Sequence, residues 1–142
     1  MFDTVLIAGL GLMGGSMAKT IKARTLSRVL GWNRTRATAE QALADGSIDA
    51  IATEALYKEA DLVIIGLYPQ ATVDWLIENM PKMKKGCVIV DMVGVKQFMV
   101  DHLEQAALDA GVHYVGGHPM AGREFSGLDY SLPTLFDGAS MI

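Results

Sequence analysis

TVLIAGLGLMGGS, residues 4–16, is the stretch that decides the fold of this 142-residue chain. It opens with a short apolar run, residues 4–10, which stops at glycine and is typical of a strand buried on both faces. Gly9, Gly11 and Gly14 follow the pattern G-x-G-x-x-G, and residues 16–23 continue as an expected helix. A buried strand, a glycine turn and a helix in this order predict a turn that binds the phosphates of a dinucleotide.

The three glycines have separate tasks in such a turn. Gly9 permits the tight turn, Gly11 leaves room for a pyrophosphate, and Gly14 lets the helix pack closely on the strand. Leu12 and Met13 lie between these glycines and are further candidates for cofactor contact, just before the expected helix, whose free N–H groups and positive dipole end bind phosphate. The alternative is a glycine-rich turn that holds no ligand.

Strands and helices alternate along the rest of the chain. Apolar strands are expected at residues 28–32, 62–67, 87–90 and 112–115, and helices at residues 35–45, after Pro69 and at residues 96–110. This order predicts an α/β domain with a doubly wound, mostly parallel sheet and helices on both of its faces. Residues 140–142 resemble the opening of a further strand, so we expect residues 1–142 to be one dinucleotide-binding domain that stops at a domain boundary.

Two of the expected helices have a recognisable apolar face. After Pro69, the apolar side chains recur at helical spacing, at Val73, Leu76, Ile77 and Met80. In the helix at residues 96–110, the inward face is expected to carry Phe98, Met99, His102, Leu103 and Ala106. His102 on this face and His113 at a strand start are therefore interpreted as structural.

Composition excludes several other classes of protein. The chain has 12 Lys and Arg against 16 Asp and Glu, a net charge of −4, which argues against a nucleic-acid binder. Its single cysteine, Cys87, excludes a disulfide framework and a CxxC metal site, and no metal is expected. The longest stretch without charged residues, 4–18, is too short to span a bilayer. It is not a signal peptide either, because the residues before it carry Asp3 and no positive side chain. We expect a cytoplasmic domain with neither membrane nor nucleic acid as a partner.

The end of the second expected strand bears on which dinucleotide is bound. NAD-binding domains usually carry an acid there, whereas this chain has Asn33, followed by Arg34, Thr35 and Arg36. An amide does not repel a 2′-phosphate, and Arg34 can clamp one with help from Thr35. These residues favour NADP, with NAD possible. The alternative is that Asn33 is a helix N-cap and the arginines form a solvated first turn.

Other candidate site residues follow later strands. Tyr68 and Pro69 come after the strand at residues 62–67, and Asp91 comes after the strand at 87–90; all three are candidates for cofactor contact. Lys96 could contact a substrate carboxylate, although a strand-end turn with a solvated lysine explains it equally well. His118 lies between Gly-Gly and Pro on an exposed turn, where a neutral imidazole suits removal of a hydroxyl proton during hydride transfer.

Four segments together resemble the prephenate dehydrogenase family, to which arogenate dehydrogenase is closely related. They are GLGLMGGS at 9–16, DMVGVK at 91–96, GHPMAGREFSG at 117–127 and LFDGAS at 135–140, with HPMAG the most specific. The resemblance implies a Rossmann-like cofactor half. It also implies that a following helical domain, which forms a homodimer and supplies an arginine for the substrate carboxylate, lies outside these residues.

The resemblance further implies oxidative decarboxylation of prephenate to 4-hydroxyphenylpyruvate, a step of tyrosine biosynthesis. The family's catalytic histidine corresponds to His118, and its glutamate in an ionic network that closes the site corresponds to Glu124. Lys96, Gly94 and Ser126 correspond to positions around the substrate. The family often has Ser where this chain has Gly94, so that contact is lost or replaced by water.

Two other functions remain open from the sequence. One is another NADP-dependent dehydrogenase or reductase, of the β-hydroxyacid or imine type, although those families lack the HPMAG element. The other is a nucleotide-binding module without catalysis, against which the presence of His118 and Glu124 argues.

Overall fold

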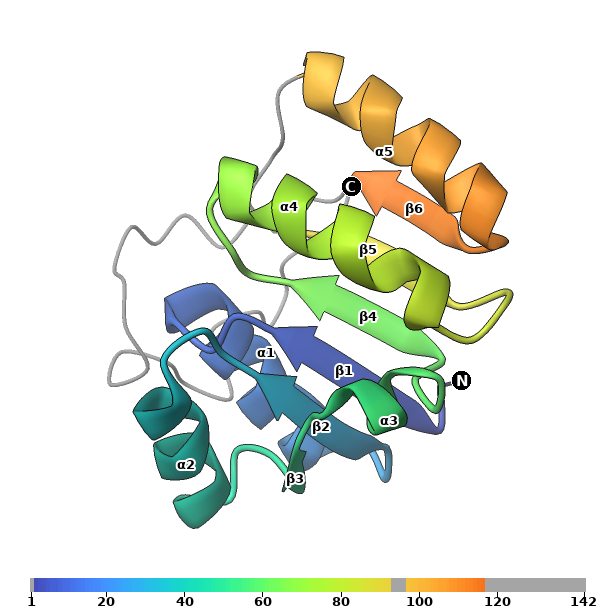
Figure 1. The fold of residues 1–142 in the computed structure, drawn as a ribbon. Coiled ribbons are helices and arrows are strands. Elements are labelled where there is room, and N and C mark those ends of the chain that lie inside the picture. The colour runs from blue at the N-terminus through green and yellow to red at the C-terminus, as the bar shows by residue number, and fades with distance from the viewer. Residues whose placement is uncertain (1, 93–96, 117–142) are drawn as a thin grey trace.

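The computed structural model describes residues 2–92 and 97–116 and shows a single parallel sheet with helices on both faces (Figure 1). The sheet has six strands in the order β3-β2-β1-β4-β5-β6, and every neighbouring pair is parallel. The strands are β1 Thr4–Ala8, β2 Arg28–Trp32, β3 Ala50–Ile51, β4 Leu62–Ile65, β5 Val88–Asp91 and β6 His113–Gly116. The winding direction reverses between β1 and β4, and ligands of such sheets bind at this reversal.

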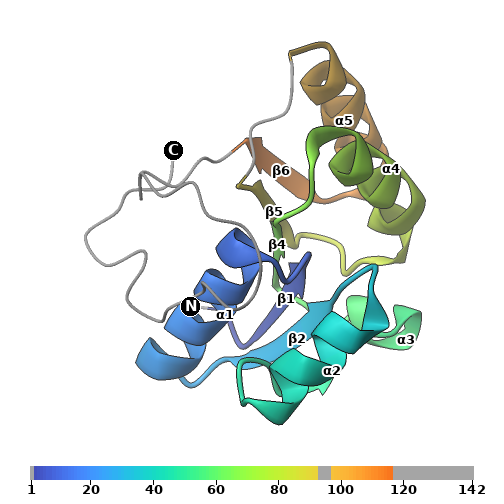
Figure 2. The ribbon, with the colours of Figure 1, turned by 90° about the vertical axis from the view of Figure 1, so that its left-hand side faces the viewer.

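The helices divide between the two faces of the sheet (Figure 2). They are α1 Leu12–Arg24, α2 Arg36–Ala44, α3 Glu54–Tyr57, α4 Pro69–Asn79 and α5 Gln97–Ala110, with a short 3-10 helix at Met80–Lys82. Side chains of α1 and α2 pack into one hydrophobic cluster, and those of α3, α4 and α5 pack into a second one. The doubly wound α/β fold expected from the sequence is therefore confirmed.

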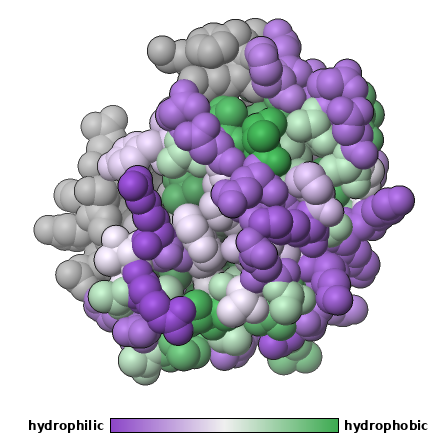
Figure 3. Space-filling view, in the orientation of Figure 1, coloured by the Kyte–Doolittle hydropathy of each residue, from purple (hydrophilic) through white to green (hydrophobic). Residues whose placement is uncertain are grey.

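The central strand β1 explains why both clusters form. Its side chains alternate: Val5 and Ile7 belong to the cluster under α1, whereas Leu6 and Ala8 belong to the cluster under α4. All four are at most 2% exposed, as predicted for a strand buried on both faces. On the outside, the face in view in Figure 3 is largely hydrophilic, with hydrophobic surface showing between α4 and α5. The helices therefore turn most of their apolar side chains toward the sheet.

An aromatic group lies on the α4 side of the sheet. The ring centroids of Trp32 and Trp75 are 5.6 Å apart, and those of Tyr57 and Trp75 are also 5.6 Å apart. Both pairs are tilted, which is a favoured geometry for aromatic rings. The group joins the end of β2 to α3 and α4.

Several boundaries and faces differ from those expected. β1 ends at Ala8 rather than at residue 10, because Gly9 leaves the extended conformation with φ +94°. α1 begins at Leu12, before the expected residue 16. β3 and α3 were not expected, because two and four residues are too few to show a period.

The expected apolar face of α4 was partly wrong. Ile77 is 47% exposed, and the buried stripe instead consists of Thr72, Trp75, Leu76 and Asn79. The two polar members of this stripe are satisfied, because Thr72 Oγ1 donates to the Leu67 carbonyl at 3.0 Å and Asn79 Nδ2 donates to the Trp75 carbonyl at 2.8 Å. Because Thr72 and Asn79 are hydrogen-bonded inside the protein, they can be buried on a face for which the sequence pattern predicts only apolar side chains.

The expectation for His102 was also wrong. His102 is exposed, whereas the next residue, Leu103, is fully buried and Ala107 is buried with it. The inward stripe of α5 therefore includes the predicted Leu103 and Ala106 but not His102. The side chains of the predicted Phe98 and Met99 lie outside those that the structure describes. His113 begins β6 and is exposed.

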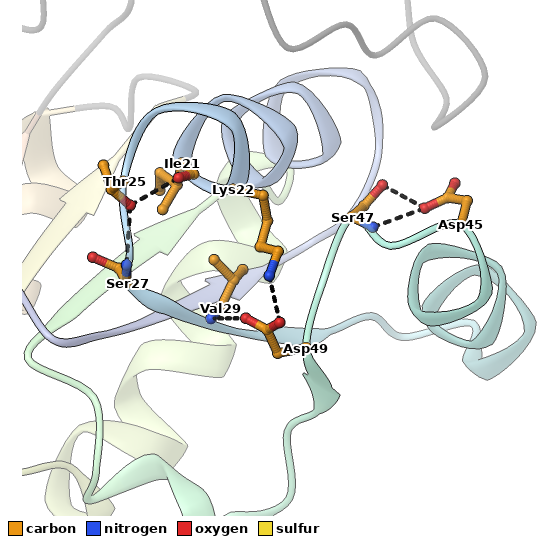
Figure 4. Close-up of polar contacts among 8 residues, drawn as sticks. All are labelled: Ile21, Lys22, Thr25, Ser27, Val29, Asp45, Ser47 and Asp49. Carbon is orange, nitrogen blue, oxygen red and sulfur yellow. Dashed lines mark hydrogen bonds and ion pairs between the residues drawn. The ribbon is translucent and has the colours of Figure 1, made fainter.

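At the amino edge of the sheet, charges tie α1 to its neighbours (Figure 4). Lys22 Nζ pairs with Asp49 Oδ1 at 2.5 Å, and the other Asp49 oxygen accepts from the Val29 N–H at 2.7 Å. Burial alone would raise the pKa of the Asp49 carboxyl, but these two hydrogen bonds and the charges of Lys22 and Arg28 hold that pKa below its usual value. The end of α1 is thus fixed to the start of β2.

Candidate functional site

The carboxyl edge of the sheet is where the turns after β1 and β4 touch. The Gly66 N–H donates to the Ala8 carbonyl at 2.7 Å. A Cβ atom on Gly9 would lie 2.7 Å from the Gly66 carbonyl oxygen, closer than real Cβ contacts come. Gly9 therefore meets both requirements for glycine, a positive φ and a close backbone neighbour. Gly66 was missed by sequence reasoning, although its place directly after an apolar strand was a signal.

Gly14 brings the start of α1 against the end of β1. A Cβ atom built on Gly14 would lie 1.7 Å from the Gly9 carbonyl oxygen and 3.2 Å from Ile7 Cγ2. No side chain fits there, so the helix axis passes as close to the strand as a dinucleotide turn requires. The part that Gly14 plays in phosphate binding stays a prediction.

The start of α1 is suited to an anion. Gly11 is its N-cap, and the Gly15 N–H makes the first helical hydrogen bond, to the Gly11 carbonyl at 2.8 Å. The N–H groups of Leu12, Met13 and Gly14 precede that bond, as the first N–H groups of any helix do. The first turn carries no acidic residue, so no carboxylate of the helix itself neutralises the positive end of the helix dipole. This geometry fits the phosphate role predicted for Gly11, Leu12 and Met13.

Asn33 lies between the two turns that would flank the adenosine end of a cofactor. Its Oδ1 accepts from the Leu10 N–H at 2.9 Å, and its Nδ2 donates to the Thr35 carbonyl at 3.0 Å. Thr35, not Asn33, is the N-cap of α2, and no side chain caps that helix. The alternative in which Asn33 caps a helix is therefore wrong.

The two arginines next to Asn33 differ in their contacts. Both are exposed, but Arg36 pairs with Glu40 one turn along α2, with Nε and Oε1 3.2 Å apart. For Arg34 the structure shows no hydrogen bond or ion pair to any residue in the ranges 2–92 and 97–116. The first turn of α2 has no acidic residue. An unpaired guanidinium beside the positive end of a helix has a strong preference for an anion.

Tyr68 and Pro69 lie at the same edge of the sheet, after β4. Tyr68 is the N-cap of α4 and is 78% exposed, and Pro69 is the first residue of the helix. Because β4 pairs with β1, these residues follow the strand next to the glycine turn. Their predicted contact with the cofactor agrees with this position and stays a prediction.

Asp91 ends β5 and is 1% exposed. The Tyr114 hydroxyl from β6 lies 3.4 Å from Asp91 Oδ2 and donates to it. Burial raises the pKa of the Tyr114 hydroxyl, and the charge of Asp91 raises it further, so the hydroxyl keeps its proton. Asp91 is also in register with Gly116, the last described residue of β6. The strands that lead to Lys96 and His118 are thus held side by side.

Several predicted site residues lie outside the described residues. These are the predicted catalytic residues His118 and Glu124 and the predicted substrate residues Gly94, Lys96 and Ser126. Within the described part of the chain, no three His, Cys, Asp or Glu side chains group as a metal site would require. A helix with the length and apolar character needed to cross a membrane is not found in that same part.

Comparison with known proteins places this geometry in a family. The family model described as "Prephenate dehydrogenase, nucleotide-binding domain" matches residues 17–142. The prephenate dehydrogenase of Bacillus subtilis (strain 168) is 38% identical over 146 residues, which cover 100% of this chain and 39% of that protein. The chain therefore spans about two fifths of this curated relative.

Solved structures agree with the family match. Prephenate dehydrogenase from A. aeolicus, in complex with hydroxyphenyl propionate and NAD+, is 30% identical with a TM-score of 0.80, covering 99% of this chain and 50% of that one. Arogenate dehydrogenase from Synechocystis has a TM-score of 0.86 at 24% identity, covering 97% and 48%, and shows the same fold. The glycine turn, the sheet order and these matches together show that the chain belongs to the family of prephenate dehydrogenase nucleotide-binding domains.

Proposed function

We propose that this chain is the nucleotide-binding half of an NAD(P)-dependent prephenate dehydrogenase. The observation that carries the proposal is the approach of Gly14 to the Gly9 carbonyl, which places the start of α1 where a pyrophosphate binds in dinucleotide domains. Membership of the family supplies the reaction, since the A. aeolicus relative was solved with NAD+ and a hydroxyphenyl ligand.

The cofactor is proposed to lie across the carboxyl edge of the sheet. Its pyrophosphate would meet Gly9, Gly11, Leu12, Met13 and Gly14 at the start of α1. Its adenosine end would lie near the end of β2, and its nicotinamide on the β4 and β5 side of the reversal point, where Tyr68, Pro69 and Asp91 are found. The exposed Tyr68 and the buried Asp91 carboxylate would then border the reactive ring.

We further propose that NADP is preferred over NAD. Support comes from the absence of a carboxylate at Asn33 and from the exposed Arg34, for which no partner is found among residues 2–92 and 97–116. A 2′-phosphate would satisfy the Arg34 guanidinium and benefit from the positive end of α2. A ribose hydroxyl would gain far less from the same groups.

The chemistry is proposed to take place just beyond β5 and β6. His118 follows the end of β6 by two residues and would accept the ring hydroxyl proton as hydride leaves the same carbon. When bound, the nicotinamide supplies the hydride acceptor. The C–C bond to the carboxylate then breaks, carbon dioxide departs, and the proton returns to the phenolate oxygen as the ring becomes aromatic. Glu124, Lys96, Gly94 and Ser126 would surround the substrate.

The whole protein is proposed to be a cytoplasmic homodimer that acts on prephenate or arogenate, with neither membrane nor nucleic acid as a partner. Curated relatives are more than twice as long as the matching region, so we propose that the substrate pocket is completed by residues outside 1–142. The binding of cofactor by this chain does not depend on that completion.

Fluorescence titration with NADPH and with NADH tests the proposal directly. Both are expected to bind to the purified chain, NADPH more tightly, with enhanced nicotinamide emission. Failure of both to bind would overturn the proposed function. Tighter binding of NADH than of NADPH would leave the family function in place and refute the preference argued from Asn33 and Arg34.

A further inference from the structure

The Asn33 side chain continues the hydrogen bonding between β1 and β2 past the last strand residue. The backbone contributes the Gly9 N–H, which donates to the Trp32 carbonyl at 2.7 Å. The next N–H along, that of Leu10, donates to Asn33 Oδ1 at 2.9 Å. The amide oxygen therefore accepts a hydrogen bond from the glycine turn directly after the last backbone bond between the two segments. Leu10 itself is fully buried, so its N–H depends on this acceptor inside the protein.

The other half of the same amide holds the start of α2. Asn33 Nδ2 donates to the carbonyl of Thr35, the N-cap residue, at 3.0 Å. One side chain thus connects the glycine turn that leads into α1 with the turn that leads into α2. Only an amide offers an acceptor and a donor at these two ends, because a carboxylate would set an oxygen against the Thr35 carbonyl.

We infer that Asn33 is a positioning residue, which sets the spacing between the phosphate site at the start of α1 and the ribose site at the start of α2. This inference rests on the proposed function and changes the role of Asn33 from cofactor ligand to connector. Recognition of the 2′ position then falls to Arg34 and Thr35, which are both exposed. In NAD-binding domains the residue at the end of this strand contacts the ribose itself.

The two roles predict opposite results for an acidic substitution. If Asn33 were a ribose ligand, Asn33→Asp would provide the acid of NAD-binding domains and tighten NAD+ binding. As a connector, Asn33→Asp keeps the acceptor for the Leu10 N–H but loses the donor to Thr35, so NAD+ binding does not tighten. Asn33→Ala loses both hydrogen bonds and weakens every ligand that spans the two sites, whatever its 2′ group.

The experiment combines amide exchange without nucleotide and calorimetric titration with NADP+ and NAD+. In Asn33→Ala, exchange of the Leu10 amide is expected to accelerate about tenfold or more, whereas the Ile89 amide in β5 stays unchanged. Both nucleotides should then bind about tenfold more weakly, by a similar factor for each. Asn33→Asp should keep the Leu10 protection. The control Arg34→Ala should weaken NADP+ alone and leave the Leu10 amide unchanged.

Two results would overturn the inference. One is tighter NAD+ binding by Asn33→Asp than by the wild-type chain. The other is an Asn33→Ala protein, shown to be folded by its urea transition, in which Leu10 exchange and NAD+ affinity are both unaltered. A wild-type chain that binds neither nucleotide overturns the proposed function instead, and the exchange of Leu10 distinguishes that failure because it needs no ligand.

Discussion

Gly14 lies so close to Gly9 that a methyl group on Gly14 would overlap the Gly9 carbonyl oxygen, at 1.7 Å. The start of α1 therefore rests directly on the end of β1, with backbone against backbone. Both partners in this contact are main-chain atoms, so neither can rotate away as a flexible side chain could. The same contact therefore both positions the phosphate site and contributes to the stability of the domain.

Gly14→Ala is expected to lower the free energy of unfolding by about 3 kcal/mol and to abolish nucleotide binding, because the helix must move off the strand. Urea unfolding and NADPH titration measure the two effects. Gly46→Ala is the control: Gly46 has φ +83° with no atom within 4 Å of its added Cβ, so it should cost only about 1 kcal/mol. Equal losses for the two variants would contradict the packing argument.

Arg34→Gln is expected to weaken NADP+ binding about 10- to 100-fold while NAD+ binding changes less than about twofold, since only the 2′-phosphate contact is lost. Arg36→Gln makes the same charge change at a residue that already pairs with Glu40 and should have a much smaller effect. Calorimetric titration of both variants with both nucleotides checks this. A parallel loss of NAD+ affinity in Arg34→Gln would assign Arg34 to another part of the cofactor.

His118→Asn is expected to lower kcat by about 10²- to 10⁴-fold in an enzyme that contains this chain and its substrate pocket, as loss of a general base does. His113→Asn is the matched control, because His113 is exposed at the other end of β6. Steady-state assays of NADPH formation measure both. A near-normal kcat for His118→Asn would remove this imidazole from the mechanism.

Asp61 makes the stability of the domain depend on pH. The Lys84 ammonium, 2.5 Å from Asp61 Oδ1, and the N–H groups of Thr4 and Asp3, each 3.1 Å from Oδ2, hold the pKa of this carboxyl below its usual value. A lowered pKa in the folded state stabilises the protein above the unfolded-state value of about 3.9, and this contribution is lost as the pH falls through the folded-state pKa.

Asp61→Asn should therefore flatten the acid limb of a plot of unfolding free energy against pH, measured by urea titration from about pH 6 down to about pH 2. Asp74→Asn makes the same charge change on an exposed carboxylate whose partner is the uncharged Gln70 amide, and the limb should keep its slope. If both variants lose the same slope, the acid sensitivity arises from net charge and not from the Asp61 contacts.

Cys87 is expected to be unreactive in the folded chain. It is 2% exposed, and burial together with the charge of Asp61 raises the pKa of its thiol to about 11. The thiolate is the reactive form, so labelling with a disulfide reagent at about pH 8 should be at least a hundredfold slower in buffer than in denaturing urea. Because Cys87 is the single cysteine, the signal is unambiguous. Rapid labelling in buffer would show that the segment around Cys87, directly before β5, opens readily.

The sequence predicted those features that depend on neighbouring residues. The apolar run of β1, the spacing of Gly9, Gly11 and Gly14, and the alternation of strands and helices are all local, and the fold they predicted is the one observed. The exposure of His102 and Ile77 was not predictable in this way, because helix rotation is set by packing against the sheet.

Contacts between distant segments were missed for a related reason. The Asn33 side chain accepts a hydrogen bond from Leu10, 23 positions earlier in the chain, and Gly66 contacts Gly9 just beyond the ends of the paired strands β1 and β4. Neither contact produces a recognisable spacing of residues in the sequence, because each depends on which strands become neighbours in the sheet. The roles of His118, Glu124, Gly94, Lys96 and Ser126 depend on residues outside the described ones and stay predictions.

The two tryptophans of the chain stand next to each other, and Trp32 ends β2 directly before Asn33. Indole emission responds to charge and solvent nearby, and the centroids of the two rings lie 5.6 Å apart. The domain therefore carries an intrinsic optical reporter beside the proposed adenosine site. Filling of that site is therefore expected to change the ultraviolet emission of any variant that keeps both indoles.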